Sequence, residues 1–584
     1  MEEKQQSVRH SFAHLLAAAV TELYPKAKPS IGPAIEHGFY YDFDFGKIKI
    51  SDADLEKIEE KMQEILSSWQ DGPWFEGKEV DTEEAKKAFQ GNEYKEELID
   101  ELEEKGETIT LYTTGNFVDL CRGGHARSPK DLRADSFKLT HLAGAYWRGD
   151  EKNPMLTRIY GAAFEDKEEL DTYLNHLEEA KKRDHKKLGP QLDLFTFSPL
   201  VGAGLPLWTP KGTKLRHLLD DFIWQLRSTQ GYEKVEIPHI TKKDLYEKSG
   251  HWDKFKDELF HISTREGHEF VLKPMNCPHH TQIYARKAWS YRELPQRYAN
   301  TTMVYRDEQS GELAGLSRVR SISMDDAHVF ARKSQVKEEF LKIWDMIDEF
   351  YSALGFSDLE VRLSFHDPEH PEKYLGDEKL WQEAEDQLKA LAKEKKVKSV
   401  EALGEAAFYG PKVDFMASDS MGRPWQVATI QLDMNMPERF DLVCTNEKGE
   451  EERIVMIHTA IAGSLERLLS VLIEHFAGKF PVWLSPVQVR VLAVSDKFQG
   501  YAESVSQRLK EAGIRSELAP ANETLGKRIR KAKEEKIPYL LVVGENEEKA
   551  GTVTAEHYRE DKIGQLTIEE LIERIQQEIS EKKI

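Results

Sequence analysis

The chain has 584 residues, of which 39% are hydrophobic and 32% charged, and its formal net charge is −22. A prior of roughly 150 residues per domain predicts three or four domains, and the hydrophobic share excludes a disordered chain. No apolar run approaches the roughly 20 residues that span a bilayer, and the first residues lack a secretory signal, so we expect a globular cytoplasmic protein without membrane contact.

The N-terminal third alternates helical and strand-like segments. Apolar residues at helical spacing predict helices over residues 7–20 and 53–68, with a loop and a strand between them. A long amphipathic helix is predicted over residues 166–187, and Leu188-Gly189-Pro190 is expected to end it. We therefore predict a first domain of α+β type over residues 1–188.

Two further domains are predicted after this helix. Residues 189–483 contain several strands in which polar and apolar residues alternate, a pattern that favours an antiparallel sheet. Residues 484–584 alternate strands and helices, which predicts a small α/β domain rich in parallel strands. The overall expectation is an α+β multidomain protein.

Three segments of the central domain each contain one metal-ligand side chain. They supply Cys277, His328 and His458, and the chain has only three cysteines in all. A zinc ion with three protein ligands keeps one position open for substrate. A structural metal, or no metal, is the alternative. A closed structural site would need a fourth ligand, and no fourth Cys or His motif is evident.

Arginines accompany these segments. Arg306 and Glu308 lie in Tyr305-Arg-Asp-Glu, Arg318 follows shortly after, and Arg467 follows a Gly-Ser pair. The planar guanidinium binds phosphate oxygens in a bidentate manner and stays charged, so such a set suits a nucleotide phosphate. Taken singly, each arginine is as readily explained by a surface ion pair.

The N-terminal domain holds a second cluster of reactive side chains. His10 and His14 are one helical turn apart, and Cys121 and His125 come much later in the chain. Such a group could bind a second zinc ion or could position a water that hydrolyses an ester. A pair of histidines at this spacing is otherwise often a packing accident.

These motifs, taken in order, resemble those of the class II aminoacyl-tRNA synthetases. The segment Thr229–Pro238 is similar to motif 1 of that class, and the arginine segments are similar to motifs 2 and 3. From residue 7 onwards the chain resembles the bacterial-type threonyl-tRNA synthetases. The matching segments are Met275-Asn-Cys-Pro, Asp325-Asp-Ala-His, Ala407–Lys412 and Ile457–Arg467.

The resemblance implies roles for individual residues and a function for each domain. An antiparallel catalytic core would lie between an N-terminal editing domain and a C-terminal anticodon-binding domain. The implied catalytic residues are Arg306, Arg467, His251 and Lys412. The implied ATP-binding residues are Arg306, Glu308, Arg318, Gln426 and Arg467. The implied threonine-binding residues are Asp326, Tyr409 and Gln431, and the implied zinc ligands are Cys277, His328 and His458. The implied editing residues are His10, His14, Tyr41, Asp119, Cys121 and His125. The implied anticodon-binding residues are Asn522 and Glu547.

The implied reaction is ATP-dependent activation of L-threonine and its transfer to threonine tRNA, with hydrolysis of mischarged seryl-tRNA. The resemblance implies one zinc ion per subunit, magnesium with ATP, and a homodimer. It also implies that the ubiquitin-like domain found before the editing domain in the family is absent. The alternatives are a non-catalytic RNA-binding relative and a synthetase for another amino acid.

Four positions depart from the family pattern: His279, Met324, Gly124 and Glu556. The first two are expected near the amino-acid pocket, where they would alter its shape. Gly124, where relatives usually have proline, is expected to loosen the turn between Cys121 and His125 without removing a functional group. Glu556 would repel phosphate in the anticodon-binding domain.

Overall fold

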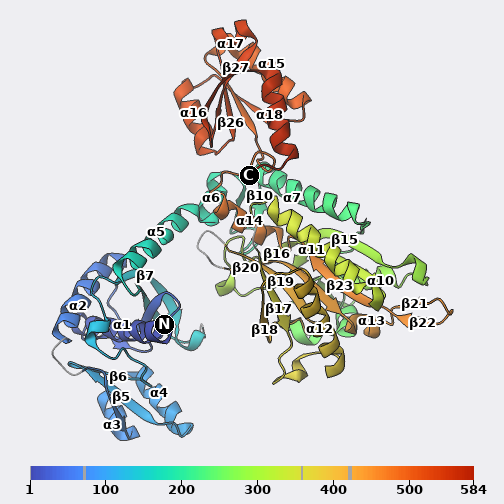
Figure 1. The fold of residues 1–584 in the computed structure, drawn as a ribbon. Helices are drawn as coiled ribbons and strands as arrows, with labels where there is room; N and C mark the ends of the chain where they lie inside the picture. The colour runs from blue at the N-terminus through green and yellow to red at the C-terminus, as the bar shows by residue number, and fades with distance from the viewer. Residues whose placement is uncertain (1, 70–73, 151, 357–358, 419–423) are drawn as a thin grey trace. The chain divides into compact units, whose positions relative to one another are not determined.

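The computed structural model describes residues 2–69, 74–150, 152–356, 359–418 and 424–584. The chain forms two compact units, Met1–Glu178 and Glu179–Ile584 (Figure 1). The domain boundaries at residues 188 and 483 stay a prediction. Among the described residues, no helix is both long enough and apolar enough to cross a bilayer.

The first unit is built around the helix α1 (Glu2–Leu23), which packs against an antiparallel sheet. The apolar stripe Phe12, Leu15, Leu16 and Ala19 is fully buried, as its helical spacing predicts. The helix α2 (Leu55–Ser68) completes this core. The sheet contains β1 (Lys28–Pro29), β2 (Ala34–Ile35), β3 (Gly38–Asp44), β7 (Phe137–Tyr146) and β8 (Met155–Ala163).

A smaller sheet in the same unit positions two of the predicted editing residues, Asp119 and Cys121. Its three antiparallel strands are β4 (Glu76–Val80), β5 (Ile109–Thr114) and β6 (Phe117–Leu120). Two helices lie between β4 and β5 in sequence: α3 (Thr82–Ala88) and α4 (Glu93–Glu104). Cys121 directly follows β6, so the strand end determines where the thiol lies.

The break in the long connecting helix differs from the prediction. The structure has α5 (Lys167–Arg183) and a second helix α6 (His185–Gln191), and Leu188-Gly189-Pro190 lies inside α6. The Asp184 carboxylate accepts a 2.8 Å hydrogen bond from the backbone N–H of Lys186. Aspartate stabilises a helix start in this way, so the chain begins a new helix at Asp184 instead of ending one at Leu188.

The second unit contains an eight-stranded sheet, and the predicted antiparallel arrangement is confirmed for its central strands. Only the edge pairs β11–β15 and β17–β18 are parallel. The strands in spatial order are β11 (Glu233–Lys234), β15 (Gln296–Tyr305), β16 (Ser321–Ala331), β23 (Val455–Ala460), β20 (Pro424–Asp433), β19 (Lys412–Ser418), β17 (Glu360–Phe365) and β18 (Ser399–Leu403).

Alternate residues of these strands point to opposite faces. In β16, Ala327 and Val329 belong to the main hydrophobic core, whereas Asp326 and His328 point to the other face. The core face is covered by α7 (Pro210–Thr229), α11 (Val336–Ser352), α12 (Glu378–Glu394) and α14 (Leu465–His475). The opposite face is therefore left for polar side chains.

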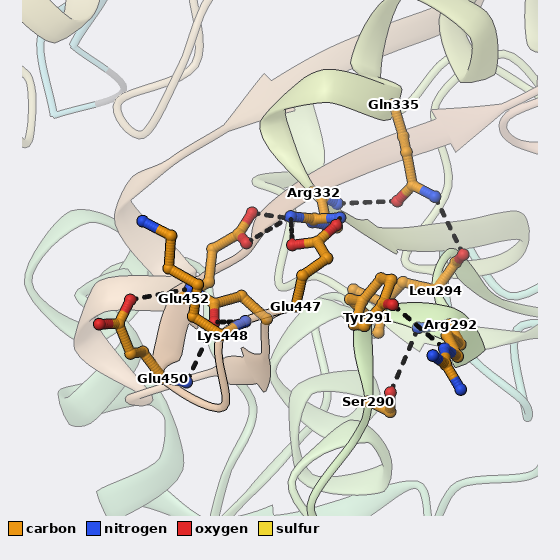
Figure 2. A network of polar contacts seen from close by, with 11 residues as sticks. Ser290, Tyr291, Arg292, Leu294, Arg332, Gln335, Glu447, Lys448, Glu450 and Glu452 are labelled. Carbon is orange, nitrogen blue, oxygen red and sulfur yellow. Dashed lines mark hydrogen bonds and ion pairs between the residues drawn. The ribbon is translucent and has the colours of Figure 1, made fainter.

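A polar network anchors the hairpin of β21 (Val443–Thr445) and β22 (Glu451–Arg453) to the end of β16. Arg332 donates hydrogen bonds to Glu447 and Glu452, each with a shortest distance of 2.7 Å (Figure 2). Gln335 donates to the carbonyl of Leu294 at 2.9 Å. One guanidinium thus satisfies two carboxylates and holds the hairpin in place.

The C-terminal part has a five-stranded sheet with helices on both faces (Figure 1). The predicted run of parallel strands is confirmed for three of them. In order the strands are β25 (Ser516–Ala519), β24 (Val489–Ala493), β26 (Tyr539–Val543), β27 (Thr552–His557) and β28 (Asp561–Thr567), the last two being antiparallel. The helices are α15 (Gln499–Glu511), α16 (Leu525–Glu534), α17 (Glu545–Ala550) and α18 (Ile568–Ser580).

Candidate functional site

The register of the large sheet places residues from separate strands in one row. His328 of β16 lies opposite His458 of β23, which lies opposite Gln431 of β20, which in turn lies opposite Lys412 of β19. Asp326 precedes His328 by two residues and therefore shares its face. Side chains more than 100 positions apart in sequence thus become neighbours.

The predicted metal ligands come together at this row. Cys277 begins the helix α10 (Cys277–Tyr284), and its ligand atom and those of His328 and His458 all lie within 4.8 Å of one another. All three side chains are buried. Nε2 of His328 makes no hydrogen bond to any described residue and lies 3.6 Å from the Asp326 carboxylate, so this buried nitrogen has no protein hydrogen-bond partner to prevent it from binding a metal. One thiol and two imidazoles fit zinc.

Two partners of these histidines were missed by sequence reasoning. Nδ1 of His328 lies 2.8 Å from Nδ1 of His280, and Nε2 of His458 lies 2.9 Å from Asp433. Metal-binding histidines usually hydrogen-bond through their second nitrogen, and this bond orients the ring. The available signal was that His280 lies one turn after Cys277, while Asp433 gave no local signal.

A cavity of about 610 Å³ opens beside the metal-ligand cluster. Arg467 of α14 donates through Nε to the carbonyl of Ser317 at 3.1 Å, and Arg318 donates to Glu308 at 2.7 Å. Burial first, and then the positive charges of Arg306 and Arg318, lower the pKa of Arg467. Three guanidiniums therefore face a common space, as an anion site requires. The predicted residues lining the cavity are Cys277, Arg306, Glu308, Arg318, Asp326, His328, Tyr409, Gln426, Gln431, His458 and Arg467.

The residues predicted to bind the amino acid form a rigid wall of that cavity. The Tyr409 hydroxyl donates to Gln431 at 2.7 Å, and the Tyr409 ring stacks on His458 with centroids 4.9 Å apart. Asp326 accepts a 3.0 Å hydrogen bond from the amide of Asn276. Neighbouring residues thus hold the Asp326 carboxylate and the Tyr409 ring in place before any ligand binds.

Two predicted catalytic residues do not line the cavity. His251 is buried, with Nδ1 2.8 Å from the Ser249 hydroxyl and Nε2 3.9 Å from the Cys277 sulfur. Lys412 donates to Asp414 at 2.6 Å. Phe408 and Tyr409 pack against the His251 ring and themselves line the cavity.

The departures at the pocket lie in different places. Met324 lines the cavity, whereas His279 is buried in α10, with its ring about 6.3 Å from that of Tyr246. Neither ring nitrogen of His279 has a hydrogen-bond partner among the described residues. Met324 is therefore the departure that contributes to the cavity wall.

The four candidates of the N-terminal cluster also come together. Nε2 of His10 lies 3.1 Å from the Cys121 sulfur, and Nε2 of His125 lies 3.4 Å from it. Nδ1 of His14 lies 3.2 Å from Asp119. Burial lowers the pKa of His125 to about 2 and raises the pKa of the Cys121 thiol to about 11. The imidazole is then neutral and the thiol protonated at neutral pH, and donors of this type could also hold a metal ion.

Lys95 is a functional candidate that sequence reasoning missed. Its ammonium lies 2.5 Å from Asp119 and 3.1 Å from the Tyr41 hydroxyl, which itself donates to Asp119 at 2.5 Å. Lys95 and Asp119 are each only 2% exposed. Both line a cavity of about 420 Å³ together with His10, His14 and Cys121. Lys95 is the only basic residue of α4, whose other charged residues are all acidic, and no local pattern linked it to Asp119.

Gly124 gives the turn between Cys121 and His125 a shape that proline cannot adopt. Its φ is +86°, and that of Gly123 is +92°. Proline holds φ near −65°, so the family residue would not fit this backbone. His125 nevertheless reaches Cys121 and stacks on Phe75, with ring centroids 3.9 Å apart.

The anticodon candidates lie at separate places in the C-terminal domain. Asn522 is exposed before α16, whereas Glu547 accepts from Thr554 at 2.8 Å and from the backbone of Gly544 at 2.9 Å. Glu556 pairs with Lys533 at 2.9 Å. The negative charge that was expected to repel phosphate therefore has a positive neighbour.

Comparison with known families identifies three regions. Residues 260–476 match the family described as "tRNA synthetase class II core domain (G, H, P, S and T)", and residues 488–578 match "Anticodon binding domain". Residues 109–160 match "Threonyl and Alanyl tRNA synthetase second additional domain". The solved "RNA binding domain of Threonyl-tRNA synthetase" from Cryptosporidium parvum Iowa II is 38% identical with a TM-score of 0.64. The match covers 68% of this chain and 98% of that chain.

Curated relatives match almost the whole chain. A threonine–tRNA ligase of Flavobacterium johnsoniae is 47% identical over 581 residues, which cover 99% of this chain and 89% of the relative. The threonine–tRNA ligase of Porphyromonas gingivalis is 49% identical, and the match covers 98% of this chain and 87% of the relative. That of Gloeobacter violaceus is 47% identical, with 99% and 93% covered. The chain therefore belongs to the threonine–tRNA ligase family of class II aminoacyl-tRNA synthetases.

Proposed function

We propose that this protein activates L-threonine with ATP and magnesium and transfers it to the 3′-terminal adenosine of threonine tRNA. The observation that carries the proposal is the cavity itself. It joins three arginines suited to phosphate with Asp326, Gln431 and the metal-ligand cluster on one face of the sheet. A non-catalytic RNA-binding role would not require this combination.

The amino acid would lie between the metal ligands and Tyr409. Cys277, His328 and His458 would hold zinc, and the bound ion would supply an open coordination position for an amino acid that bears a hydroxyl group. Asp326 would accept a hydrogen bond from that hydroxyl, and Gln431 would orient the amino group. A hydrophobic pocket alone separates threonine from valine by only roughly 100-fold, so a polar requirement is needed.

The arginines would bind the nucleotide. Arg306 would contact the α-phosphate as the threonine carboxylate attacks it, and Arg318 and Arg467 would bracket the triphosphate. Glu308 would accept from the adenine amine, with Gln426 nearby. Lys412 would contribute indirectly, through its hydrogen bond to Asp414, and not by direct contact with the nucleotide. His251, whose neighbours Phe408 and Tyr409 line the cavity, would accept the ribose hydroxyl proton in the transfer step.

The N-terminal cluster would hydrolyse seryl-tRNA. Serine has the hydroxyl and lacks only one methyl group, which is worth roughly 1–3 kcal/mol in a pocket, so a second hydrolytic site is needed. The cavity at Cys121 contains neutral imidazoles around a protonated thiol, which suits the positioning of a water rather than attack by sulfur. Lys95 and Tyr41 would fix Asp119 beneath it.

We further assign editing to residues 1–188, catalysis to residues 189–483 and anticodon binding to residues 484–584, where Asn522 and Glu547 are the candidate contacts. The enzyme would act in the cytoplasm as a homodimer. A second cavity of about 330 Å³ between α7 and β15 exposes polar groups of the motif 1 region, where a partner subunit would bind. Sedimentation analysis would show a single species of twice the chain mass.

Pyrophosphate exchange tests the synthetic reaction. We expect exchange that depends on threonine, weaker exchange with serine, and exchange near background with valine. Chelation should abolish the threonine-dependent exchange, and elemental analysis should find one zinc ion per chain before chelation. Equal exchange with valine and threonine would contradict the metal-dependent selection.

Deacylation tests the second site separately. A His14→Ala variant should accumulate seryl-tRNA while it still charges threonine, because His14 belongs to the first unit and the synthetic cavity to the second. Unchanged deacylation of seryl-tRNA by this variant would remove the editing assignment.

A further inference from the structure

His185 joins two elements of the synthetic site without touching its cavity. Its side chain is buried, with 4% of the residue exposed. Nε2 accepts a 3.1 Å hydrogen bond from the backbone N–H of Leu316, and Nδ1 lies 2.7 Å from the Glu474 carboxylate. Because Nε2 must be the acceptor, Nδ1 carries the proton and donates to Glu474. Asp184, His185 and Glu474 carry side chains of the kind that bind metals, but both ring nitrogens of His185 already have hydrogen-bond partners.

The backbone before Leu316 lies directly on the His185 ring. Gly315 has a φ of +56°, and a Cβ at this position would lie 2.3 Å from Nε2 of His185. That distance is far below van der Waals contact, so only glycine permits the approach. The hydrogen bond and this close approach both indicate that the His185 ring fixes the position of the backbone at Gly315 and Leu316.

The loop supported in this way carries residues of the ATP cavity. The Ser317 carbonyl accepts from Arg467, and the Ser317 hydroxyl lies 2.9 Å from that of Ser470. Arg318 follows at once and binds Glu308. Both Arg467 and Glu474 belong to α14, so the loop is attached to this helix twice, directly through Ser317 and indirectly through His185.

We propose that His185 is a positioning residue for ATP. By accepting the Leu316 N–H while anchored on Glu474, it holds the segment 315–318 at the distance from α14 at which Arg318 and Arg467 bracket the nucleotide. The inference rests on the proposed synthetic function. It assigns to the start of α6, the helix that follows the connecting helix α5, a role in the affinity for ATP.

Two substitutions separate this role from simple packing. In His185→Asn the amide can still reach Glu474, but nothing reaches the Leu316 N–H. In His185→Gln the longer side chain places an oxygen near the position of Nε2 and restores that acceptor. We expect His185→Asn to raise the KM for ATP in threonine-dependent pyrophosphate exchange about tenfold, as the loss of one buried hydrogen bond predicts. The KM for threonine should stay unchanged. His185→Gln should stay within about twofold of the unaltered protein.

Further variants keep the test decisive. Gly315→Ala leaves His185 in place and pushes the loop off the ring, so it should reproduce the effect on ATP even if His185→Asn fails to fold. Lys187→Gln, an exposed position on the same helix, is the matched control. All four variants should deacylate seryl-tRNA normally.

Several results would overturn the inference. They are an unchanged KM for ATP in Gly315→Ala or in folded His185→Asn, equal losses in the Asn and Gln variants, or a fall in kcat with both KM values unchanged. Failure of the proposed function would look different, because the unaltered protein itself would then show no threonine-dependent exchange.

Discussion

Replacement of Lys95 by methionine tests the buried charge network of the first unit. Lys95 and Asp119 are each 2% exposed, and their charged atoms lie 2.5 Å apart. Methionine fills much of the same volume but leaves the Asp119 carboxylate without its cation. Breaking a buried ion pair by removing one partner costs about 3–5 kcal/mol. We expect about 3 kcal/mol here, because the Tyr41 hydroxyl still donates to the carboxylate.

Hydrogen exchange of the intact chain measures this cost. At about 1.4 kcal/mol per tenfold change, amides of α4 and β5 protected by global opening of the first unit should exchange about 100-fold faster in Lys95→Met. Amides of α14, in the second unit, should be unaffected and serve as the internal reference. Seryl-tRNA deacylation should be lost, and threonine-dependent exchange should be retained.

A double substitution decides whether charge is the cause. Lys95→Met combined with Asp119→Asn removes both charges, so most of the lost protection should return while deacylation stays absent. The reasoning is refuted if Lys95→Met alone exchanges like the unaltered protein, or if the double variant is as labile as the single one.

Three further predictions concern other parts of the chain. Cys277→Ala should lower the zinc content to background, because only two of the three protein ligands remain. Elemental analysis of the folded variant checks this. Gly124→Pro should abolish seryl-tRNA deacylation without altering threonine activation, since proline cannot adopt a φ of +86° and His125 must move; normal deacylation would show that the turn can rearrange. Lys533→Gln should raise the KM for tRNA several-fold by leaving Glu556 unpaired, and the additional change Glu556→Gln should reverse the rise; equal KM values at low salt would contradict an electrostatic role for this pair.

Local patterns in the sequence determined the helices, the strands and the identity of most reactive groups. His10 and His14 face one side of α1 because residues four positions apart lie one helical turn apart. Asp326 and His328 share a face because strand side chains alternate. The same local reasoning erred at Leu188-Gly189-Pro190, where the capping carboxylate of Asp184 outweighed the expected helix breakers.

Only the tertiary structure decided which of these groups meet. The register that sets His328 opposite His458 depends on a strand pairing across more than 100 residues, and no local pattern encodes it. The same is true of Lys95, whose helix is brought to Asp119, and of His185, whose ring supports a loop 130 positions away. Burial and long-range pairing arise when distant segments pack together, so these partnerships appear only in the folded chain.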